Sequence, residues 1–407
     1  MPCVIRQKED NIDMKELSKI ALAVEPSSTM AIDAMFKQMK AEGQDVIGFG
    51  AGEPDFPTPD HIKEAGIQAI RNNDTRYTPS VGTVELRKAI CQRLKADCGL
   101  DYDFKDIAVS NGAKTCVYVA LRALVNPGDE VILPAPYWVS YIELIRMVGG
   151  VPVVIDTTEA EHFKITAEKL AAAITPKTKV LVLPFPCNPT GGTMDRQDLE
   201  AIAQVLEGTD IMVLSDEIYA ELTYGQRHVS MANLEEMYDR TIVVNGFSKS
   251  HAMTGWRMGY VCAPKPIIQC LTKLHQFGIM SAPTVSQYAA IEAMRNGDRD
   301  IEHMREEYDS RRRYLVENLR RIGLSCFEPK GAFYVFPDIR STGLTSNEFC
   351  ERFLREERVA VIPGSAFGPG GEGFVRACYA ASMKDISEAI TRMDNFLTNL
   401  RRSQGRG

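Results

Sequence analysis

Positive charge and long apolar runs are both scarce in this sequence of 407 residues. Its 47 lysine and arginine residues are outnumbered by 54 aspartate and glutamate residues, so the formal net charge is −7. Proteins that bind nucleic acids or membrane surfaces concentrate positive charge on one face. No apolar stretch is long enough to cross a bilayer, and the first residues lack the apolar core of a signal peptide. We therefore predict no nucleic-acid partner and no membrane partner.

Cysteine and histidine are present, but not in the arrangements that bind metals or form redox pairs. The ten cysteines include no C-x-x-C pair, and the six histidines lack the spacing of zinc ligands. Several cysteines lie inside apolar runs, as reduced cysteines of cytoplasmic proteins do. A G-x-G-x-x-G match, Gly368–Gly373, precedes a predicted strand instead of opening a helix, so it does not indicate dinucleotide binding. We predict a cytoplasmic protein without a metal site.

Short apolar runs alternate with helical patterns from about residue 105 onward. The predicted strands are rich in valine and isoleucine: Ile107–Val109, Val131–Leu133, Val153–Ile155, Val180–Leu183, Ile211–Leu214, Ile242–Val244 and Met258–Cys262. Such alternation predicts an α/β fold with a mostly parallel central sheet covered by helices on both faces. Some connections are too short for a crossover helix, so we expect a mixed sheet.

A change of pattern after residue 290 predicts a second domain. A long charged helix, Ile301–Arg321, is followed by the apolar segment Ala332–Pro337 and later by a helix at Lys384–Leu400. We expect a large cofactor-binding domain over residues 51–290 and a smaller α+β domain over residues 291–407. Residues 1–50 are expected to form an N-terminal arm and part of the small domain.

Polar side chains follow three of the predicted strands. Asn188, Asp216 with Tyr219, and Lys249 each come directly after a different apolar run. Ligands bind outside the carboxyl ends of strands in open α/β sheets, so we expect these side chains to meet at one edge. One such residue alone would be better explained as a turn or helix cap. Three strands that supply side chains suited to one reaction favour an active site.

This set of side chains suits pyridoxal 5'-phosphate. A lysine such as Lys249 can form a Schiff base with the cofactor aldehyde and move the substrate's α-proton. A carboxylate such as Asp216 would keep the pyridine nitrogen protonated, and Tyr219 and Asn188 would contact the ring oxygen. Trp138 offers an aromatic face on which the ring can stack.

The phosphate of this cofactor needs backbone N–H groups at a helix start and a cation. The turn of Gly112, Ala113 and Lys114 directly precedes a predicted helix, Thr115–Leu124, and supplies the N–H groups. Arg257, eight residues after Lys249, supplies the charge.

From about residue 14 to near its end, the sequence resembles fold-type I, class I pyridoxal-phosphate-dependent aminotransferases, and most of all the prokaryotic-type aspartate aminotransferases. The matching stretches are Ala51–Phe56, Arg76–Gly82, Glu85–Arg87, Asn126–Glu130, Pro136–Trp138, Asn188–Gly191, Ser215–Tyr219, Ser248–Lys249, Met253–Arg257 and Gly331–Tyr334. The resemblance implies the PLP-transferase fold, a homodimer with shared active sites, and amino-group transfer between an L-amino acid and a 2-oxo acid. Aspartate or glutamate and 2-oxoglutarate are the implied substrates.

The resemblance also implies roles beyond the catalytic Lys249, Asp216 and Tyr219. Arg376 resembles the arginine that binds the substrate α-carboxylate, and the backbone at Gly52 closes over that carboxylate. Tyr77 resembles a phosphate contact that reaches across from a partner subunit. Lys114 and Thr29 resemble the pair that binds a distal carboxylate in this subgroup.

One position departs from the pattern, and several functions stay open. Many relatives carry a hydroxyl residue three positions before the lysine, where this sequence has Gly246. We therefore expect phosphate binding to depend more on Arg257 and the helix start at Gly112. An aromatic-amino-acid or prephenate aminotransferase and a C–S β-lyase are alternatives on the same fold. A non-enzymatic regulator is disfavoured, because the lysine, aspartate and arginine positions are all filled.

Overall fold

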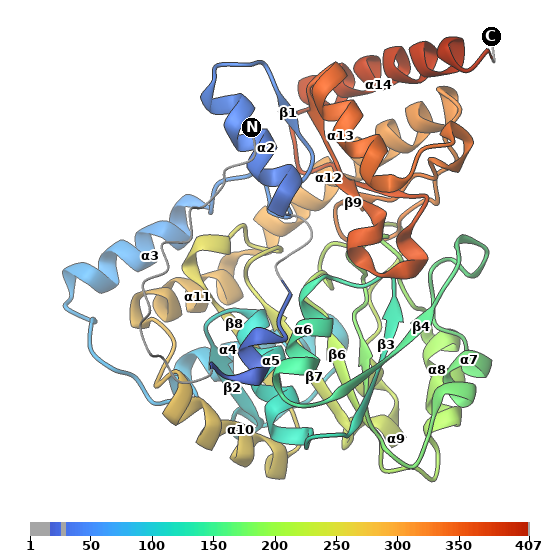
Figure 1. Ribbon diagram of the computed structural model, residues 1–407. Coiled ribbons are helices and arrows are strands. Elements are labelled where there is room, and N and C mark those ends of the chain that lie inside the picture. The colour runs from blue at the N-terminus through green and yellow to red at the C-terminus, as the bar shows by residue number, and fades with distance from the viewer. Residues whose placement is uncertain (1–16, 26–29, 406–407) are drawn as a thin grey trace, which may run out of the picture.

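The seven predicted strands form one sheet in the computed structural model, which describes residues 17–25 and 30–405 (Figure 1). The strand order is β2-β8-β7-β6-β5-β3-β4. All strands run parallel except β8, which is antiparallel to both of its neighbours. The strands are β2 (Ile107–Ser110), β3 (Glu130–Ala135), β4 (Val151–Asp156), β5 (Thr178–Leu183), β6 (Met212–Asp216), β7 (Thr241–Gly246) and β8 (Gly259–Cys262). The predicted α/β fold with a mostly parallel, mixed sheet is confirmed.

The reversal at β8 follows from the short connection that precedes it. Residues 247–258 link β7 to β8 through turns and one 3-10 helix, Thr254–Trp256. Parallel neighbours need a longer crossover connection, so the chain instead turns back and pairs β8 antiparallel to β7. This connection contains Lys249 and Arg257, which places both residues beside the sheet.

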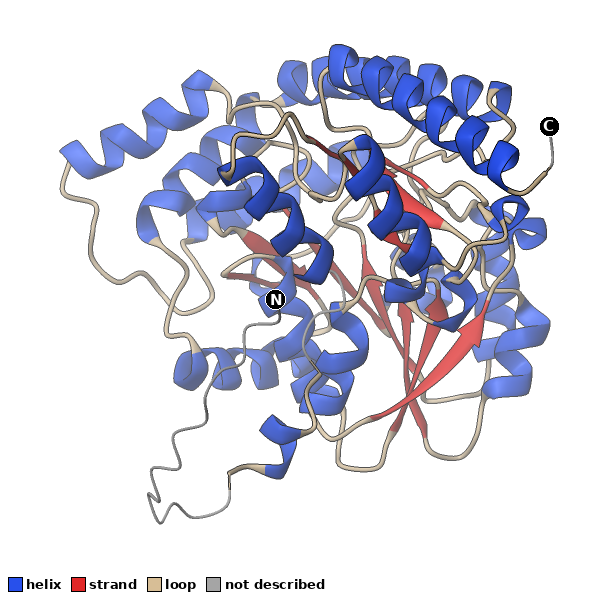
Figure 2. Cartoon of the chain, turned by 45° about the horizontal axis from the view of Figure 1, so that its top comes forward, coloured by secondary structure: helices blue, strands red, loops and turns tan. Residues whose placement is uncertain are grey.

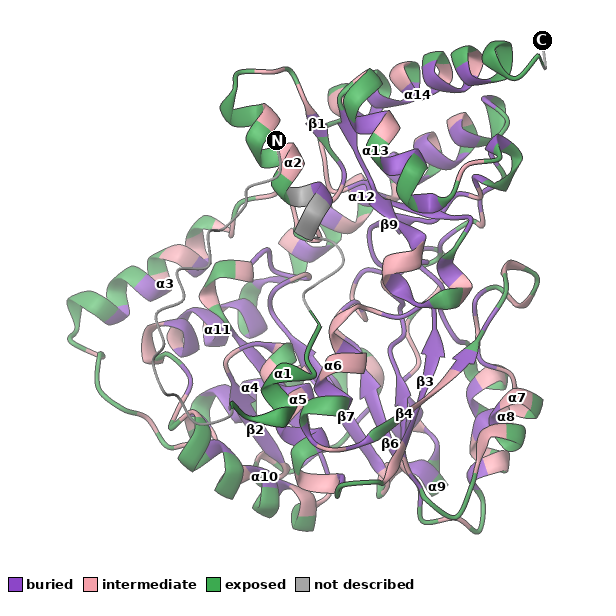
Figure 3. Cartoon of the chain, viewed as in Figure 1, coloured by how far each residue is buried: buried purple, intermediate pink, exposed green. Residues whose placement is uncertain are grey.

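Successive residues of the central strands are buried on opposite faces of the sheet. Ile242 and Val244 of β7 belong to one apolar cluster, whereas Val243 belongs to another. This alternation is the period of a strand whose two faces are both covered. Figures 2 and 3 show helices on both sides of the buried strands. One face carries α5 (Ala113–Leu124), α6 (Ser140–Met147) and α10 (Lys265–Gly278); the other carries α3 (Asp60–Arg71), α4 (Val84–Cys98), α7 (Ala167–Ala173), α8 (Arg196–Leu206), α9 (Glu235–Tyr238) and α11 (Thr284–Asn296).

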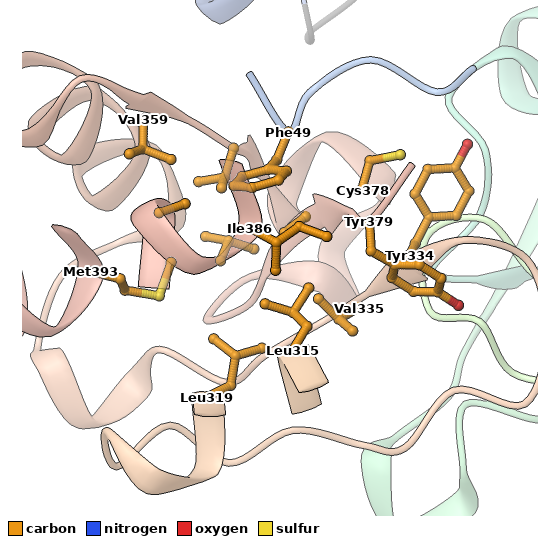
Figure 4. Close-up of a cluster of buried hydrophobic side chains, with 14 of the residues drawn as sticks. Phe49, Leu315, Leu319, Tyr334, Val335, Val359, Cys378, Tyr379, Ile386 and Met393 are labelled. Carbon is orange, nitrogen blue, oxygen red and sulfur yellow. The ribbon is translucent and has the colours of Figure 1, made fainter. Parts of the chain in front are cut away.

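A second group of elements packs around a separate apolar core, which includes Leu315, Val335 and Ile386 (Figure 4). Its strands form a three-stranded antiparallel sheet in the order β11-β12-β9, and β1 pairs with β10 in parallel. The strands are β1 (Ile47–Gly48), β9 (Tyr334–Val335), β10 (Val359–Ala360), β11 (Ile362–Pro363) and β12 (Val375–Cys378). The helices are α2 (Met30–Ala41), α12 (Asp298–Arg321), α13 (Ser346–Glu357) and α14 (Met383–Ser403); a short helix, α1 (Lys19–Leu22), precedes them.

The long helices of this group agree with the sequence pattern. The predicted helices at Ile301–Arg321 and Lys384–Leu400 correspond to α12 and α14, each extended by a few residues. Within the described ranges, no helix is both long and apolar enough to span a membrane.

Candidate active site

A cavity of about 840 Å³ lies between the carboxyl ends of β5, β6 and β7 and the strands β9 and β12. Elements that are far apart in the sequence therefore build its wall. Most of the predicted site residues line it, namely Gly52, Ala113, Lys114, Trp138, Asn188, Asp216, Tyr219, Lys249, Arg257 and Arg376.

Lys249 follows β7, and its side chain is largely enclosed by the cavity wall. Its Nζ donates a hydrogen bond to the backbone oxygen of Gly52 and lies 5.7 Å from the ring centre of Phe333. Burial lowers the pKa of Lys249 to about 8. About a tenth of this amine is therefore neutral at pH 7, and the neutral form is the one that attacks an aldehyde.

Asp216 is the last residue of β6, and only 4% of its surface is exposed. The phenol of Tyr141 donates to its Oδ2 at 2.6 Å, and the backbone N–H of Ile218 donates to its Oδ1 at 3.2 Å. Burial raises the pKa of Asp216 to about 6, and these two hydrogen bonds oppose that rise. The group is mostly a carboxylate at pH 7, so it can accept a hydrogen bond from a protonated ring nitrogen.

Arg376, on β12, is held between two aromatic rings and two oxygen acceptors. Its guanidinium lies 4.6 Å from the ring centre of Tyr334 and 5.0 Å from that of Phe367. It donates to Asn188 Oδ1 at 2.8 Å and to the Gly50 backbone oxygen at 2.7 Å. Its Nε is buried and has no partner within the described part of the chain. A buried N–H without a partner in a cavity is a place where an anionic group can bind.

The hydroxyls of Tyr219 and Tyr334 lie 2.8 Å apart, and both side chains are buried. Burial and the neighbouring phenol of Tyr334 raise the pKa of Tyr219 well above its ordinary value. Tyr219 therefore stays protonated and can donate a hydrogen bond to a phenolate-like oxygen. Tyr334 belongs to the matching stretch Gly331–Tyr334, but the resemblance gave it no role.

The loop from Gly50 to Asp55 contacts two of the cationic groups that line the cavity, Lys249 and Arg376. The Gly50 and Gly52 oxygens accept from Arg376 and Lys249, respectively. Asp55 anchors this loop to α12, because Arg311 Nη1 lies 2.9 Å from each of its carboxylate oxygens. The predicted role of the Gly52 backbone, closing over the substrate α-carboxylate, stays a prediction, and the sequence held no signal for the Asp55–Arg311 pair.

The start of α5 and the side chain of Arg257 form a narrow anion cradle. Gly112 precedes the helix with φ = 83°, and a Cβ atom there would lie 2.6 Å from Arg257 Nη2. Glycine is required at this position both by the positive φ and by the close approach of the guanidinium. Arg257 donates to the backbone oxygens of Thr254 at 3.0 Å and Asn111 at 3.4 Å. The arrangement suits a phosphate group.

The departure at Gly246 has a structural reason. Gly246 faces Gly259 in the register of β7 with β8. A Cβ atom at position 246 would lie 2.8 Å from the backbone oxygen of Met258 and 3.0 Å from Gly259 Cα. A hydroxyl side chain therefore does not fit here without a shift of the backbone. Ser248, two positions later, lines the cavity instead.

Tyr77 differs from the predicted residues that line the cavity. Tyr77 is 84% exposed and does not line the cavity. Thr29 lies outside the described residues. Lys114 lines the cavity and stands over the ring of Trp138, with 4.9 Å between Nζ and the ring centre. Burial, and to a lesser degree Arg257, lowers the pKa of Lys114.

Comparison with known proteins identifies the family. Residues 44–393 match the family described as "Aminotransferase class I and II". An aspartate aminotransferase of Bacillus sp. (strain YM-2) is 45% identical over 393 residues, which cover 94% of this chain and 100% of the relative. The structure of Thermus thermophilus aspartate aminotransferase with maleate has a TM-score of 0.90 and 38% identity, with 94% and 100% coverage. The aromatic aminotransferase from Pyrococcus horikoshii OT3 has a TM-score of 0.86 and 43% identity, with 89% and 99% coverage.

The fold and the cavity together define a pyridoxal-phosphate-dependent enzyme. The chain belongs to the class I and II aminotransferases, which move an amino group between an amino acid and a 2-oxo acid. The side chains of the cavity fit pyridoxal 5'-phosphate by their chemistry. Lys249 has a lowered pKa, Asp216 is a buried carboxylate, and Arg257 stands at a helix start.

Proposed function

We propose that this chain is an aspartate aminotransferase that uses 2-oxoglutarate as the amino-group acceptor. The observation that carries the proposal is that Arg376 and Lys114 line the same cavity as Lys249. A dicarboxylic substrate has an α-carboxylate for the arginine and a distal carboxylate for the lysine. Two further points support it: the aspartate aminotransferase names of several relatives and the maleate bound by the Thermus thermophilus enzyme.

In this proposal Lys249 carries the proton transfer, and Asp216 supports it. When bound, pyridoxal phosphate absorbs the electrons that remain at the substrate's α-carbon after its proton leaves. Lys249 Nζ, which is partly neutral at pH 7, would accept that proton and return it to C4′ of the cofactor. The Asp216 carboxylate would hold the ring nitrogen in its protonated form through a charge-assisted hydrogen bond.

The remaining residues bind and orient the two reactants. The N–H groups at Gly112 and Ala113, together with Arg257, would bind the cofactor phosphate, and Trp138 would stack on the ring. Tyr219 and Asn188 contact the ring oxygen; Asn188 also holds Arg376 in place. Because Arg376 Nε has no partner among the residues that the structure describes, it can form the second arm of a bidentate bond to a carboxylate.

A second candidate is an aromatic-amino-acid aminotransferase. The same cavity has an apolar wall that includes Phe36, Val139, Ile362 and Phe367. Such a wall could bind an aromatic side chain in place of a distal carboxylate. The aromatic aminotransferase of Pyrococcus horikoshii, at 43% identity, supports this candidate.

A substrate comparison separates the two candidates. We expect kcat/KM with 2-oxoglutarate to be at least about tenfold higher for aspartate than for phenylalanine. Replacing the distal cation, Lys114→Gln, should lower kcat/KM for aspartate and leave that for phenylalanine nearly unchanged. Lys105→Gln, on the surface away from the cavity, is the matched control. A preference for phenylalanine in the wild-type enzyme would replace the first candidate by the second.

The predicted homodimer also belongs to this proposal. Tyr77 and Phe277 are 84% and 94% exposed, and Met280 is exposed as well, which is unusual for large apolar side chains. A partner subunit would cover them and bring its Tyr77 to the phosphate site. We further propose residues 51–290 and 291–407 as the two domains. The cytoplasmic location stays a prediction.

A further inference from the structure

Tyr141 connects the two side chains that bracket the expected position of the cofactor ring. It lies in the first turn of α6 and is buried, and its ring lines the cavity. Its hydroxyl is 2.6 Å from Asp216 Oδ2. Its ring meets that of Trp138 edge to face, with centres 5.3 Å apart and planes at 87°. One residue therefore contacts both the carboxylate and the stacking aromatic.

The direction of the hydrogen bond between Tyr141 and Asp216 is unambiguous. Burial, followed by the negative charge of Asp216, raises the pKa of Tyr141 well above its ordinary value. The phenol thus stays protonated and donates, and the carboxylate accepts. A separation of 2.6 Å is in the range of charge-assisted O–H···O⁻ bonds, which are stronger than neutral ones.

This bond opposes the main influence on Asp216, which is burial. Burial raises the pKa of Asp216 to about 6, and the Tyr141 phenol is the strongest group that lowers it. The other groups that face the carboxylate are the Ile218 N–H and Lys249, which lower its pKa, and Glu217, which raises it. The buried thiol of Cys116, on α5, also faces Asp216: burial and then the charge of Asp216 raise the pKa of this thiol. Without the phenol, the pKa of Asp216 would rise further, so a smaller fraction of this carboxyl group would be ionised.

We propose that Tyr141 is a positioning residue that keeps Asp216 ionised and directed at the cofactor ring. The proposal rests on the role given above to Asp216 as the partner of the ring nitrogen. Tyr141 touches neither of the reacting atoms in this assignment and acts only through the carboxylate.

The test compares Tyr141→Phe with wild type in the full-length protein freed of cofactor. The variant removes only the hydroxyl and retains the ring that packs on Trp138. The dissociation constant of pyridoxal phosphate is measured between about pH 5 and about pH 8. We expect binding at about pH 5 to weaken about tenfold, and the acid limb of the affinity profile to move up by about one pH unit. Unchanged affinity and an unchanged limb would overturn the proposal.

Tyr102→Phe is the matched control for loss of a buried phenol. The Tyr102 hydroxyl is buried without a partner among the described residues, and it lies outside the cavity. Its removal should leave both the affinity and the acid limb unchanged. If Tyr102→Phe weakens binding as much as Tyr141→Phe does, the effect reports general destabilisation, and the positioning role is rejected.

A double-variant cycle separates this inference from the function on which it rests. In an Asp216→Asn background there is no carboxylate to keep ionised, so adding Tyr141→Phe should change affinity less than about twofold. A full tenfold effect in that background would show that Tyr141 does not act through Asp216. If Asp216→Asn alone binds the cofactor as wild type does, the assignment of Asp216 is wrong and the inference is rejected with it. If only Tyr141→Phe has no effect, Asp216 retains its role and Tyr141 loses its own.

Discussion

Arg376 donates a hydrogen bond of 2.8 Å to the side-chain oxygen of Asn188, a residue 188 positions earlier in the chain. The bond joins β12 to the segment after β5, so it links the two groups of packed elements. Together with the bond to the Gly50 oxygen, it fixes the guanidinium plane, while Nε has no partner in residues 17–25 and 30–405. The cation that we propose to bind the substrate carboxylate is therefore positioned before any substrate arrives, which reduces the entropy lost on binding.

The first prediction concerns the geometry of this arginine. Arg376→Lys retains the charge but loses the planar fork, so it cannot hold Asn188, Gly50 and a carboxylate together. We expect kcat/KM for aspartate to fall about a hundredfold, with most of the change in KM. Steady-state kinetics measures this. Arg352→Lys, an exposed ion-pair residue on α13, is the control and should retain wild-type kinetics. Equal behaviour of the two variants would argue against the carboxylate role.

The second prediction concerns the pH dependence of Lys249. Its pKa is lowered to about 8, so the neutral amine increases as pH rises through that value and then stops increasing. Covalent capture of pyridoxal phosphate should accelerate about tenfold between about pH 7 and about pH 9 and then level off. An ordinary lysine would give about a hundredfold rise over the same range without levelling.

The absorbance of bound cofactor above roughly 400 nm follows this capture. Lys249→Ala should bind cofactor without capture, and borohydride should leave no cofactor attached to that variant. A profile that continues to rise above about pH 9 would contradict the lowered pKa of Lys249.

The third prediction concerns the tight contact at Gly246. Gly246→Ser places a side chain 2.8 Å from the Met258 oxygen, so β7 and β8 must separate locally. We expect the free energy of unfolding to fall by about 1–3 kcal/mol. Denaturant unfolding measures this, with Gly255→Ser as the control because a Cβ atom at position 255 meets nothing within 4 Å. If the two variants were equally stable, the close approach would not be the reason for glycine at position 246.

The fourth prediction concerns shared active sites. A Tyr77→Ala chain keeps its own Lys249, and a Lys249→Ala chain keeps its own Tyr77. If Tyr77 acts across the interface, a hybrid dimer has one intact site. An equimolar mixture, unfolded and refolded together, should regain roughly a quarter of wild-type activity, because roughly half the dimers are hybrids with one intact site each. Each variant refolded alone is the control; a mixture no more active than their average would place Tyr77 outside the partner's site.

Much of the fold could be predicted from the sequence because its signals are local. The seven strands are short runs of β-branched residues, and burial on both faces leaves that pattern in each run. The order of the strands could not be predicted, since insertion of β8 between β2 and β7 depends on pairing between distant segments. Helix α11 was also not predicted: it buries alanine, serine and glutamine side chains, so its apolar periodicity is weak.

The sequence by itself determined the chemistry of the cavity. Lys249, Asp216, Tyr219 and Asn188 are placed by the strands they follow, and strand ends can be located from local patterns. Tertiary structure alone decided which distant groups complete the site. The Tyr141–Asp216 bond and the Asp55–Arg311 pair join residues 75 and 256 positions apart. Such contacts leave no periodic signal in the sequence, because they arise only when helices and loops pack against the finished sheet.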